Sequence, residues 1–320
     1  MPMRQPVSPK LLISLFLAVF LFSFTAGNEK KTASAGLKMQ QFVINISKYA
    51  RSVDSSFIII PQNGVELAFR KLNPDAGKNT SYLNAIDGIA VEDLFFDGKV
   101  KTDSYRLKML RKIKPQREVL FSDYITDSKA VKTIARKADN EKFLFFPRRS
   151  ANEHYQYIPK KILHENANDI LKLSDARNYL YLINPAQFET KAAYFKAIAA
   201  TNYDLVAIDL FYDDIPLTAA ETQSLKTKAN GGKRLLISYV NIGAAENWRY
   251  YWKKDWRINN PLCIKKKYEG YDDEFYVEFW NRNWQKIIYG NDRSYIKKIL
   301  NAGFDGAFLD NVEGYYFLYN

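Results

Sequence analysis

The stretch Gly303–Val312 reads GFDGAFLDNV, a run of apolar residues that ends in an acid, Asp310. Near-continuous apolar runs of this length are typical of strands that are buried on both faces of a parallel sheet. Seven further runs have the same character: Phe57–Asn63, Ile86–Phe95, Arg117–Ile125, Lys142–Arg149, Tyr179–Pro185, Asp204–Phe211 and Arg234–Ile242. The sequence therefore predicts eight strands of one kind.

Amphipathic stretches lie between these runs, and most runs start about 30 residues after the previous one, which is the length of a βα unit. The expected helices are Leu37–Val53, Tyr105–Ile113, Ser128–Asp139, Ala192–Thr201, Ala219–Ala229 and Asp292–Ala302. Strands that alternate with helices favour a parallel sheet, and eight of them favour a closed (β/α)₈ TIM barrel in the α/β class. We expect one domain over residues 37–320.

One interval between strands is much longer than the others. It contains an insertion at about residues 244–284, with all five tryptophans of the chain: Trp248, Trp252, Trp256, Trp280 and Trp284. Long insertions in compact domains are usually functional or disordered, and this one is too aromatic for disorder. We expect a loop at the mouth of the barrel, followed by a helix from about Trp284. It could hold sugar rings, or it could be a hydrophobic cap.

The first residues have the features of a targeting segment. Arg4 and Lys10 precede the apolar run Leu11–Phe24, and small residues suited to cleavage follow at 25–27, with a second option at 33–35. The sequence predicts a signal peptide over residues 1–27, or over residues 1–35 if the second option is used. We therefore expect a secreted, periplasmic or cell-surface protein. The run is short for a spanning helix. An uncleaved anchor stays open as the alternative, and no span is expected in the mature chain.

Composition excludes several kinds of site. The single cysteine, Cys263, excludes an internal disulfide framework, and two histidines, His154 and His164, argue against a zinc site or a histidine dyad. No cofactor or metal is expected. The formal net charge of +12 would suit an anionic polymer, but the positive residues are scattered along helical stretches. We interpret them as solvated faces, and expect a monomer without a nucleic-acid partner.

Acids follow the apolar runs directly at several strand ends. They are Glu92 and Asp93, Asp123, Asp209, and Asp310. In barrels of this kind the active site lies at the C-terminal ends of the strands, so these carboxylates converge on one cavity. Each alone could cap a helix, although no helix is expected after Asp310. As a group they suit glycoside hydrolysis, which needs an acid and a second carboxylate, with divalent-metal binding as the competing use.

Five stretches together resemble glycoside hydrolase family 114, which includes endo-α-1,4-polygalactosaminidases. They are Gly303–Asp310, Ser238–Trp252, Tyr276–Ile288, Phe57–Gly64 and Ile86–Phe95. The resemblance implies that Asp310 is the nucleophile and Glu92 the general acid/base of a retaining hydrolase. It also implies an α-linked amino-sugar polysaccharide, polygalactosamine-like, as substrate. A catalytically inactive barrel that binds polysaccharide is the alternative.

The order of the motifs differs from the family's order. In the family the strand that resembles Tyr179–Pro185 comes first, whereas here the stretches Phe57–Gly64 and Ile86–Phe95 precede it. We interpret this as a circular permutation that keeps all eight strands. It would place Asp310 at the end of the fourth restored strand and Glu92 at the end of the sixth.

Further cleft residues follow from the strand ends and the insertion. We expect substrate contacts from Asp209, Tyr239, Asn241, Glu246, Gln62, Asn63, Asp123, Tyr124, Arg148, Trp248 and Trp280. One departure from the family's pattern is Ala244, where related proteins carry a glutamate. A deacetylated galactosamine polymer is cationic, and the expected mouth is acidic although the whole chain is basic.

Overall fold

Eight parallel strands form the centre of the molecule in a computed structural model that describes residues 26–149, 152 and 154–319. A five-stranded sheet has the order β1 (Ile58–Pro61), β15 (Gly306–Asp310), β11 (Leu235–Asn241), β8 (Leu205–Asp209) and β7 (Tyr179–Tyr181). A three-stranded sheet has the order β2 (Gly88–Glu92), β5 (Glu118–Ile125) and β6 (Leu144–Arg149). Each of the eight predicted runs contains one of these strands.

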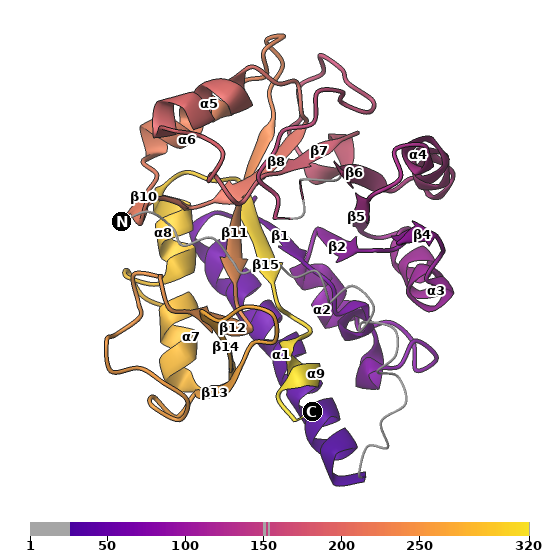
Figure 1. Ribbon diagram of the computed structural model, residues 1–320. Coiled ribbons are helices and arrows are strands. Elements are labelled where there is room, and N and C mark those ends of the chain that lie inside the picture. Colours follow the sequence, from indigo (N-terminus) through magenta and orange to yellow (C-terminus); the bar gives the residue numbers. More distant parts are fainter. Residues whose placement is uncertain (1–25, 150–151, 153, 320) are drawn as a thin grey trace.

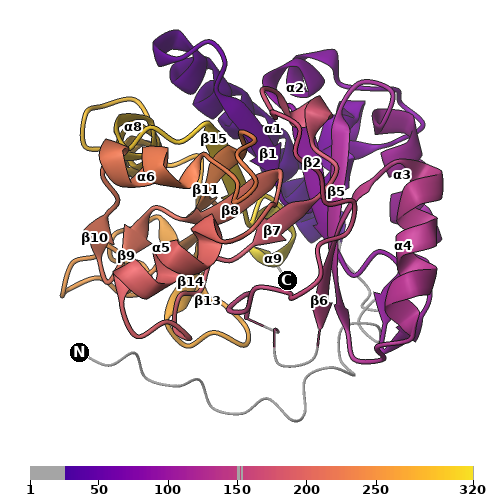
Figure 2. The same cartoon turned by 90° about the horizontal axis from the view of Figure 1, so that it is seen from above.

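The two sheets meet along β1 and β2. Gln62 and Ala90 form a parallel bridge there, and the Asn63 amide donates to the Ala90 carbonyl over 2.7 Å. At the other edges β6 packs beside β7, and the described residues of these two strands form no ladder. The fold is thus α/β with two parallel sheets, and the view from above shows their strands arranged about a common centre (Figure 2).

Helices lie outside these strands (Figures 1 and 2). They are α1 (Ala26–Val53), α2 (Thr80–Ala85), α3 (Ser104–Ile113), α4 (Ala130–Glu141), α5 (Lys191–Ala199), α6 (Ala219–Leu225), α7 (Arg282–Ile288), α8 (Tyr295–Asn301) and α9 (Gly314–Phe317), with short 3₁₀ turns at Val65–Ala68, Arg70–Leu72 and Leu173–Asp175. All six predicted helices are present. Their starts follow local capping, as at α6, where Thr218 and Glu221 form a reciprocal capping box.

Short α9 corrects one expectation, because a helix does follow Asp310. Its N-cap is Glu313, which has helical backbone angles and makes no side-chain capping bond. Asp310 ends β15 three residues earlier, so it does not cap this helix. The N-terminal half of α1 runs beside α9 (Figure 1).

The aromatic insertion is a small antiparallel sheet where a loop was expected. Its strand order is β12 (Ala244–Glu246), β14 (Glu274–Val277) and β13 (Ile264–Lys267). The expected helix follows as α7, and the buried Trp284 indole donates to the Ile242 carbonyl over 2.9 Å. Two smaller hairpins extend other strand ends, β3 (Phe96–Asp97) with β4 (Lys99–Val100), and β9 (Phe211–Tyr212) with β10 (Ile215–Pro216).

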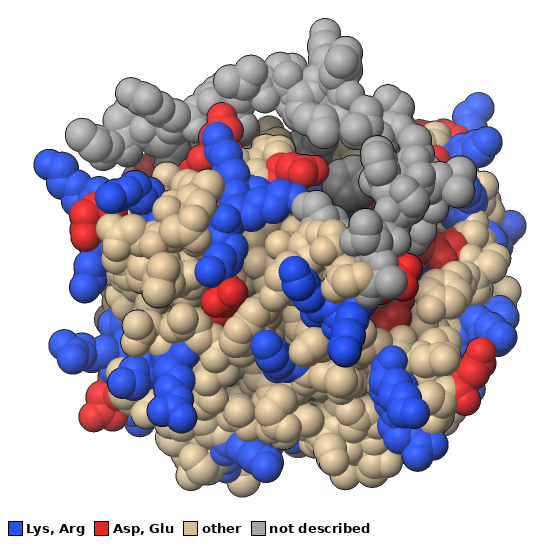
Figure 3. All heavy atoms as spheres, turned by 90° about the horizontal axis from the view of Figure 1, so that it is seen from below, with Lys and Arg blue, Asp and Glu red and all other residues tan. Residues whose placement is uncertain are grey.

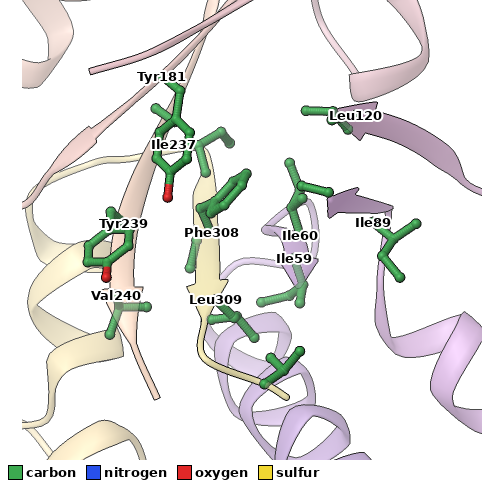
Figure 4. Packing of buried hydrophobic residues seen from close by; sticks show 14 of the residues in the cluster. Ile59, Ile60, Ile89, Leu120, Tyr181, Ile237, Tyr239, Val240, Phe308 and Leu309 are labelled. Atoms are coloured by element: carbon green, nitrogen blue, oxygen red, sulfur yellow. The ribbon is translucent and has the colours of Figure 1, made fainter. Parts of the chain in front are cut away.

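The core between the strands is largely aliphatic and aromatic (Figure 4). Tyr181 of β7 and Phe308 of β15 meet with ring centroids 4.8 Å apart. Gly306 has no space for a side chain, because an added Cβ would lie 2.3 Å from the Ile58 carbonyl oxygen. This close approach sets the spacing of β15 and β1.

The predicted signal segment lies almost wholly outside the described residues. The second cleavage option, residues 33–35, lies inside α1, where Ala35 is buried. Among the helices that the structure describes, none combines the length and the apolar composition needed to cross a membrane.

Candidate active site

Asp310 is held at the end of β15 by hydrogen bonds to both carboxyl oxygens. The Tyr239 hydroxyl donates to Oδ2 over 2.7 Å, and the Asn311 amide donates to Oδ1 over 2.8 Å. Burial raises the pKa of this carboxyl to about 7, against the effect of the Tyr239 bond, and the charge of Glu92 raises it further. Asp310 and Glu92 therefore interact electrostatically.

Glu92 ends β2, and two polar side chains contact its carboxyl group. The Tyr155 hydroxyl donates to Oε1, and Arg148 Nη2 lies 3.7 Å from the same oxygen. Arg148 itself stacks on the Tyr155 ring, with the guanidinium carbon 4.3 Å from the ring centroid. Ser122 Oγ lies 2.9 Å from the Tyr155 hydroxyl and completes this network.

Strand β1 lies between the strands that carry Asp310 and Glu92, and Asn63 at its end joins their surroundings. Its Oδ1 accepts from the Glu92 amide over 3.2 Å, and its Nδ2 donates to Glu313 Oε1 over 2.9 Å. Asn63 adopts a positive φ of 63°, a conformation that asparagine tolerates better than most residues. The predicted residue Gln62 is buried beside it.

Glu313 adds a third carboxyl to this group. Burial raises its pKa to about 8, and the charge of Asp310 contributes in the same direction. Its Oε2 is buried and finds no hydrogen-bond partner in the part of the chain that the structure describes. The site thus holds more acid than its own cations neutralise.

The predicted residues Asp209 and Glu246 are joined by Arg249 in a buried ion group. Arg249 forms a bidentate pair with Asp209 at 2.9 and 2.7 Å, and its Nε donates to Glu246 Oε2 over 2.7 Å. Burial raises the pKa of the Glu246 carboxyl, and the Arg249 charge opposes this. This ion group links β8 to β12. Asp209 and Glu246 therefore contribute to the fold through Arg249, whether or not they contact a substrate.

Glu274 comes from the insertion and lies beside the same region. It is the cross-strand partner of Glu246, and its Oε2 accepts from Asn241 Nδ2 over 3.2 Å. Asn241 in turn is the register partner of Asp310. Burial raises the pKa of Glu274 well above its usual range, with the charges of Glu246 and Asp310 acting in the same direction. Ala244 lies on this strand pair, opposite Tyr276.

The predicted residues Asp123 and Tyr124 lie at the end of β5. Asp123 is buried and accepts from the Leu94 and Phe95 amides over 2.8 and 3.0 Å, so it holds the turn after β2. Burial raises its pKa to about 7. The ring of Tyr124, the next residue, lies against Arg148.

The two predicted tryptophans differ in their surroundings. Trp248 is 41% exposed. Trp280 lies against α1, where Lys38 Nζ is 4.0 Å from the ring centroid.

The sequence did not indicate Tyr155, Arg249 and Glu274 as partners in the site, nor Tyr268 and Tyr271 between β13 and β14. Tyr155 follows β6 in a segment without periodicity, and Glu274 lies in the insertion. The run Phe275–Val277, of two aromatic residues and one β-branched residue, is the signal that could have indicated a strand there.

Two surface hollows lie away from these carboxyls. One of about 380 Å³ borders Thr190 and Asp213, and one of about 410 Å³ borders Tyr251 and Trp256. Within the described ranges, no group of three or more His, Cys, Asp or Glu side chains is arranged to hold a metal ion.

The end of the molecule toward which β15 runs is shown in Figure 3. Lys and Arg side chains are spread over this face, with Asp and Glu between them. Positive charge is therefore not gathered into one patch on the visible part of this face.

Comparison with known proteins finds a family match for the C-terminal part of the chain. Residues 176–320 match the model of the glycoside-hydrolase family GH114, which confirms the resemblance over this part and indicates a glycoside hydrolase. An uncharacterized protein of Methanocaldococcus jannaschii is 30% identical over 149 residues, 47% of this chain and 40% of that protein.

Two other relatives are uncharacterized proteins of Thermotoga maritima and Deinococcus radiodurans. They are 26% and 32% identical, over 37% of this chain and 35% and 36% of their own lengths. The matches with these three relatives thus cover 35–40% of each relative's length.

Proposed function

We propose that this chain, whose residues 176–320 match family GH114, is an endo-glycosidase that hydrolyses an α-linked amino-sugar polysaccharide with Asp310 and Glu92. The observation that carries the proposal is the arrangement of these two carboxyls. They end two strands that flank β1, and the charge of one raises the pKa of the other. Glycoside hydrolysis needs two carboxyls of this kind in different protonation states.

In the proposed first step, the ionised Asp310 attacks the anomeric carbon while the Glu92 carboxylic acid protonates the departing glycosidic oxygen. A covalent sugar ester on Asp310 and a free hydroxyl on the leaving chain result. Glu92, now ionised, then takes a proton from water, whose oxygen attacks the same carbon and releases Asp310. The net change is the addition of one water across the glycosidic bond, with the anomeric configuration retained.

Asp310 must lose its proton before the first step, and a bound substrate can cause this. Burial favours a protonated Asp310 near pH 7, whereas the first step needs this carboxyl to be ionised. A sugar ammonium beside Asp310 would favour its ionised form, because an opposite charge within about 4–6 Å lowers a carboxyl pKa. Substrate binding would then leave Asp310 ionised, as the first step requires.

The acidic side chains of the site support the proposed substrate class. Asp310, Glu313 and Glu274 make no ion pair with any Lys or Arg among the residues described, so this part of the site is acidic. Salt screens charges beyond about 8–10 Å, so these nearby acids, which a bound ammonium would ionise, matter more at contact distance than the net charge of +12. A polycationic galactosamine-type polymer suits such a site.

We further propose that the eight strands form a (β/α)₈ barrel in circularly permuted order, with residues 37–320 as one domain. The single bridge at Gln62–Ala90 and the packing of β6 beside β7 support closure at both seams. The motif order and the position of α1 beside α9 support the permutation. We propose that the mature protein is secreted, on the grounds of the signal-like N-terminus. We also propose that it is a monomer.

The test is release of reducing ends from a panel of α- and β-linked amino-sugar polymers by the purified chain that lacks residues 1–27. We expect release from α-linked galactosamine polymer, and a loss of 10³-fold or more in Asp310→Asn and Glu92→Gln. Asp255→Asn, at an exposed site, is the matched control. If the chain binds the polymer but releases nothing, it is the catalytically inactive binding barrel.

A further inference from the structure

The hairpin of β13 and β14 is fixed to the strands that carry the candidate site. The Tyr268 hydroxyl lies 3.0 Å from Asn311 Oδ1, next to Asp310 in the chain. On the other strand, Glu274 accepts from Asn241, the register partner of Asp310. Two side-chain hydrogen bonds thus hold this hairpin beside β15.

Glu274 has one carboxyl oxygen already used and one available. Its Oε2 accepts from Asn241, while for Oε1 the described residues supply no hydrogen bond and no ion pair. The side chain is only partly exposed, between Glu246 and Tyr276 on the sheet. A half-buried carboxyl group with a free oxygen can still accept a hydrogen bond, which a bound ligand can donate.

Tyr271 stands at the tip of the same hairpin. It is 49% exposed, and its ring packs edge-on against Tyr268, with centroids 5.6 Å apart. The Tyr268 ring stacks in turn on the Tyr276 ring, with centroids 4.5 Å apart, so the Tyr271 ring packs against two further aromatic rings in series. Burial raises the pKa of its hydroxyl to about 12, and the charges of Glu274, Glu92 and Asp310 act in the same direction. Its contact with Tyr268, which is bonded to Asn311 beside Asp310, puts the ring on the side of the site.

We propose that this hairpin is the substrate-binding wall of the site, an inference that rests on the proposed glycosidase function. Glu274 Oε1 accepts a hydrogen bond from the amino substituent of the sugar, and the Tyr271 ring stacks on a neighbouring sugar of the same chain. An exposed aromatic ring presents a flat apolar face at little conformational cost. Glu274 and Tyr271 are therefore specificity-determining residues, whereas Asp310 and Glu92 carry the reaction.

The test is calorimetric binding of α-linked galactosamine oligomers, fully deacetylated or fully N-acetylated, to the full mature chain carrying Asp310→Asn. In this background Glu274→Gln is expected to weaken binding of the deacetylated oligomer about tenfold and leave the acetylated oligomer within twofold. Tyr271→Ala is expected to weaken both about tenfold, and Tyr271→Phe, which keeps the ring, to change neither by more than twofold.

The controls are Glu269→Gln on the same hairpin, whose side chain is 83% exposed, and Tyr105→Ala on α3. Neither is expected to alter binding. Unchanged affinity in both Glu274→Gln and Tyr271→Ala would overturn the proposed wall, even where wild-type protein cleaves the polymer. Weakened binding in these variants, with wild type that cleaves nothing, would leave the wall standing and refute the hydrolysis instead.

Discussion

Tyr239 controls the protonation of Asp310 through a single hydrogen bond of 2.7 Å. That bond lowers the pKa of Asp310 against the effect of burial. Tyr239→Phe removes it, so we expect the acidic limb of the kcat/KM profile, near pH 7 in wild type, to move to higher pH by about one unit. The measurement is initial rate against pH on galactosamine oligomers.

A matched control for this change is Tyr194→Phe, which removes another buried hydroxyl, one bonded to the Leu182 carbonyl. It should leave the profile in place. If the acidic limb of Tyr239→Phe stays at the wild-type pH, the ionisation that limits the rate is not that of Asp310.

Asp310 is also expected to destabilise the fold at alkaline pH. Its pKa is about 7 in the native protein, against about 4 in an unfolded chain. The native state therefore binds this proton more tightly, so the stabilisation is complete below about pH 4 and is lost as pH rises through about 7. Asp310→Asn removes the ionisation, and we expect it to raise Tm at pH 8.5 by roughly 3–6 °C.

At pH 4 the same substitution should leave Tm nearly unchanged, because both side chains are then neutral. Asp255→Asn at an exposed site should have no effect at either pH. The measurement is thermal unfolding of the variants and of wild type at the two pH values. If the Tm of Asp310→Asn at pH 8.5 is equal to or lower than that of wild type, ionised Asp310 does not destabilise the native state.

At the scale of elements, the group of Asp209, Arg249 and Glu246 fastens the insertion to β8. Arg249→Met leaves two buried carboxylates without a cation, and breaking a buried ion group in this way costs about 3–5 kcal/mol. We expect a lower urea midpoint at pH 7 and a smaller loss at pH 4.5, because burial raises the pKa of Glu246 and the Arg249 charge no longer opposes its protonation.

Adding Asp209→Asn and Glu246→Gln to Arg249→Met should restore part of this stability, because the unpaired charges are then gone. Lys101→Met, which removes a cation from the exposed pair with Asp97, is the control and should leave the midpoint unchanged. An Arg249→Met midpoint equal to that of wild type would mean that the group does not fasten the insertion.

The sequence predicted the eight central strands well, because a strand buried on both faces carries its own apolar signature. It also predicted that Asp310 and Glu92 end strands of this kind. It failed for the β12–β14 sheet, whose pairing of Glu246 with Glu274 joins residues far apart in the chain. The partners Tyr155 and Arg249 were missed for the same reason, since their contacts with Glu92 and Asp209 depend on tertiary packing.

At the scale of the whole molecule, the proposed permutation predicts that the order of elements can be changed without loss of the fold. Lys31 of α1 lies over the Tyr319 ring, with Nζ 5.9 Å from the centroid, so the two ends of the described chain are neighbours. We expect a protein that runs from Lys161 to Asn320, then through a short Gly/Ser linker, then from Asn28 to Lys160, to fold.

The new termini would lie between Lys160 and Lys161, which are both exposed. Such surface sites tolerate cuts best. Circular dichroism, the urea midpoint and activity would be compared with the parent chain, with activity expected within about tenfold. A soluble product without cooperative unfolding would contradict the proposed equivalence of the two orders.

The most direct test of the two-carboxylate mechanism is the proton NMR spectrum of the first sugar released from an α-linked galactosamine oligomer. Attack by Asp310 followed by attack of water inverts the anomeric carbon twice, so the α anomer should appear first and the β anomer only by later mutarotation. Asp310→Asn should release neither on the same timescale. A first product in the β form, or undiminished release by Asp310→Asn, would contradict the roles given to Asp310 and Glu92.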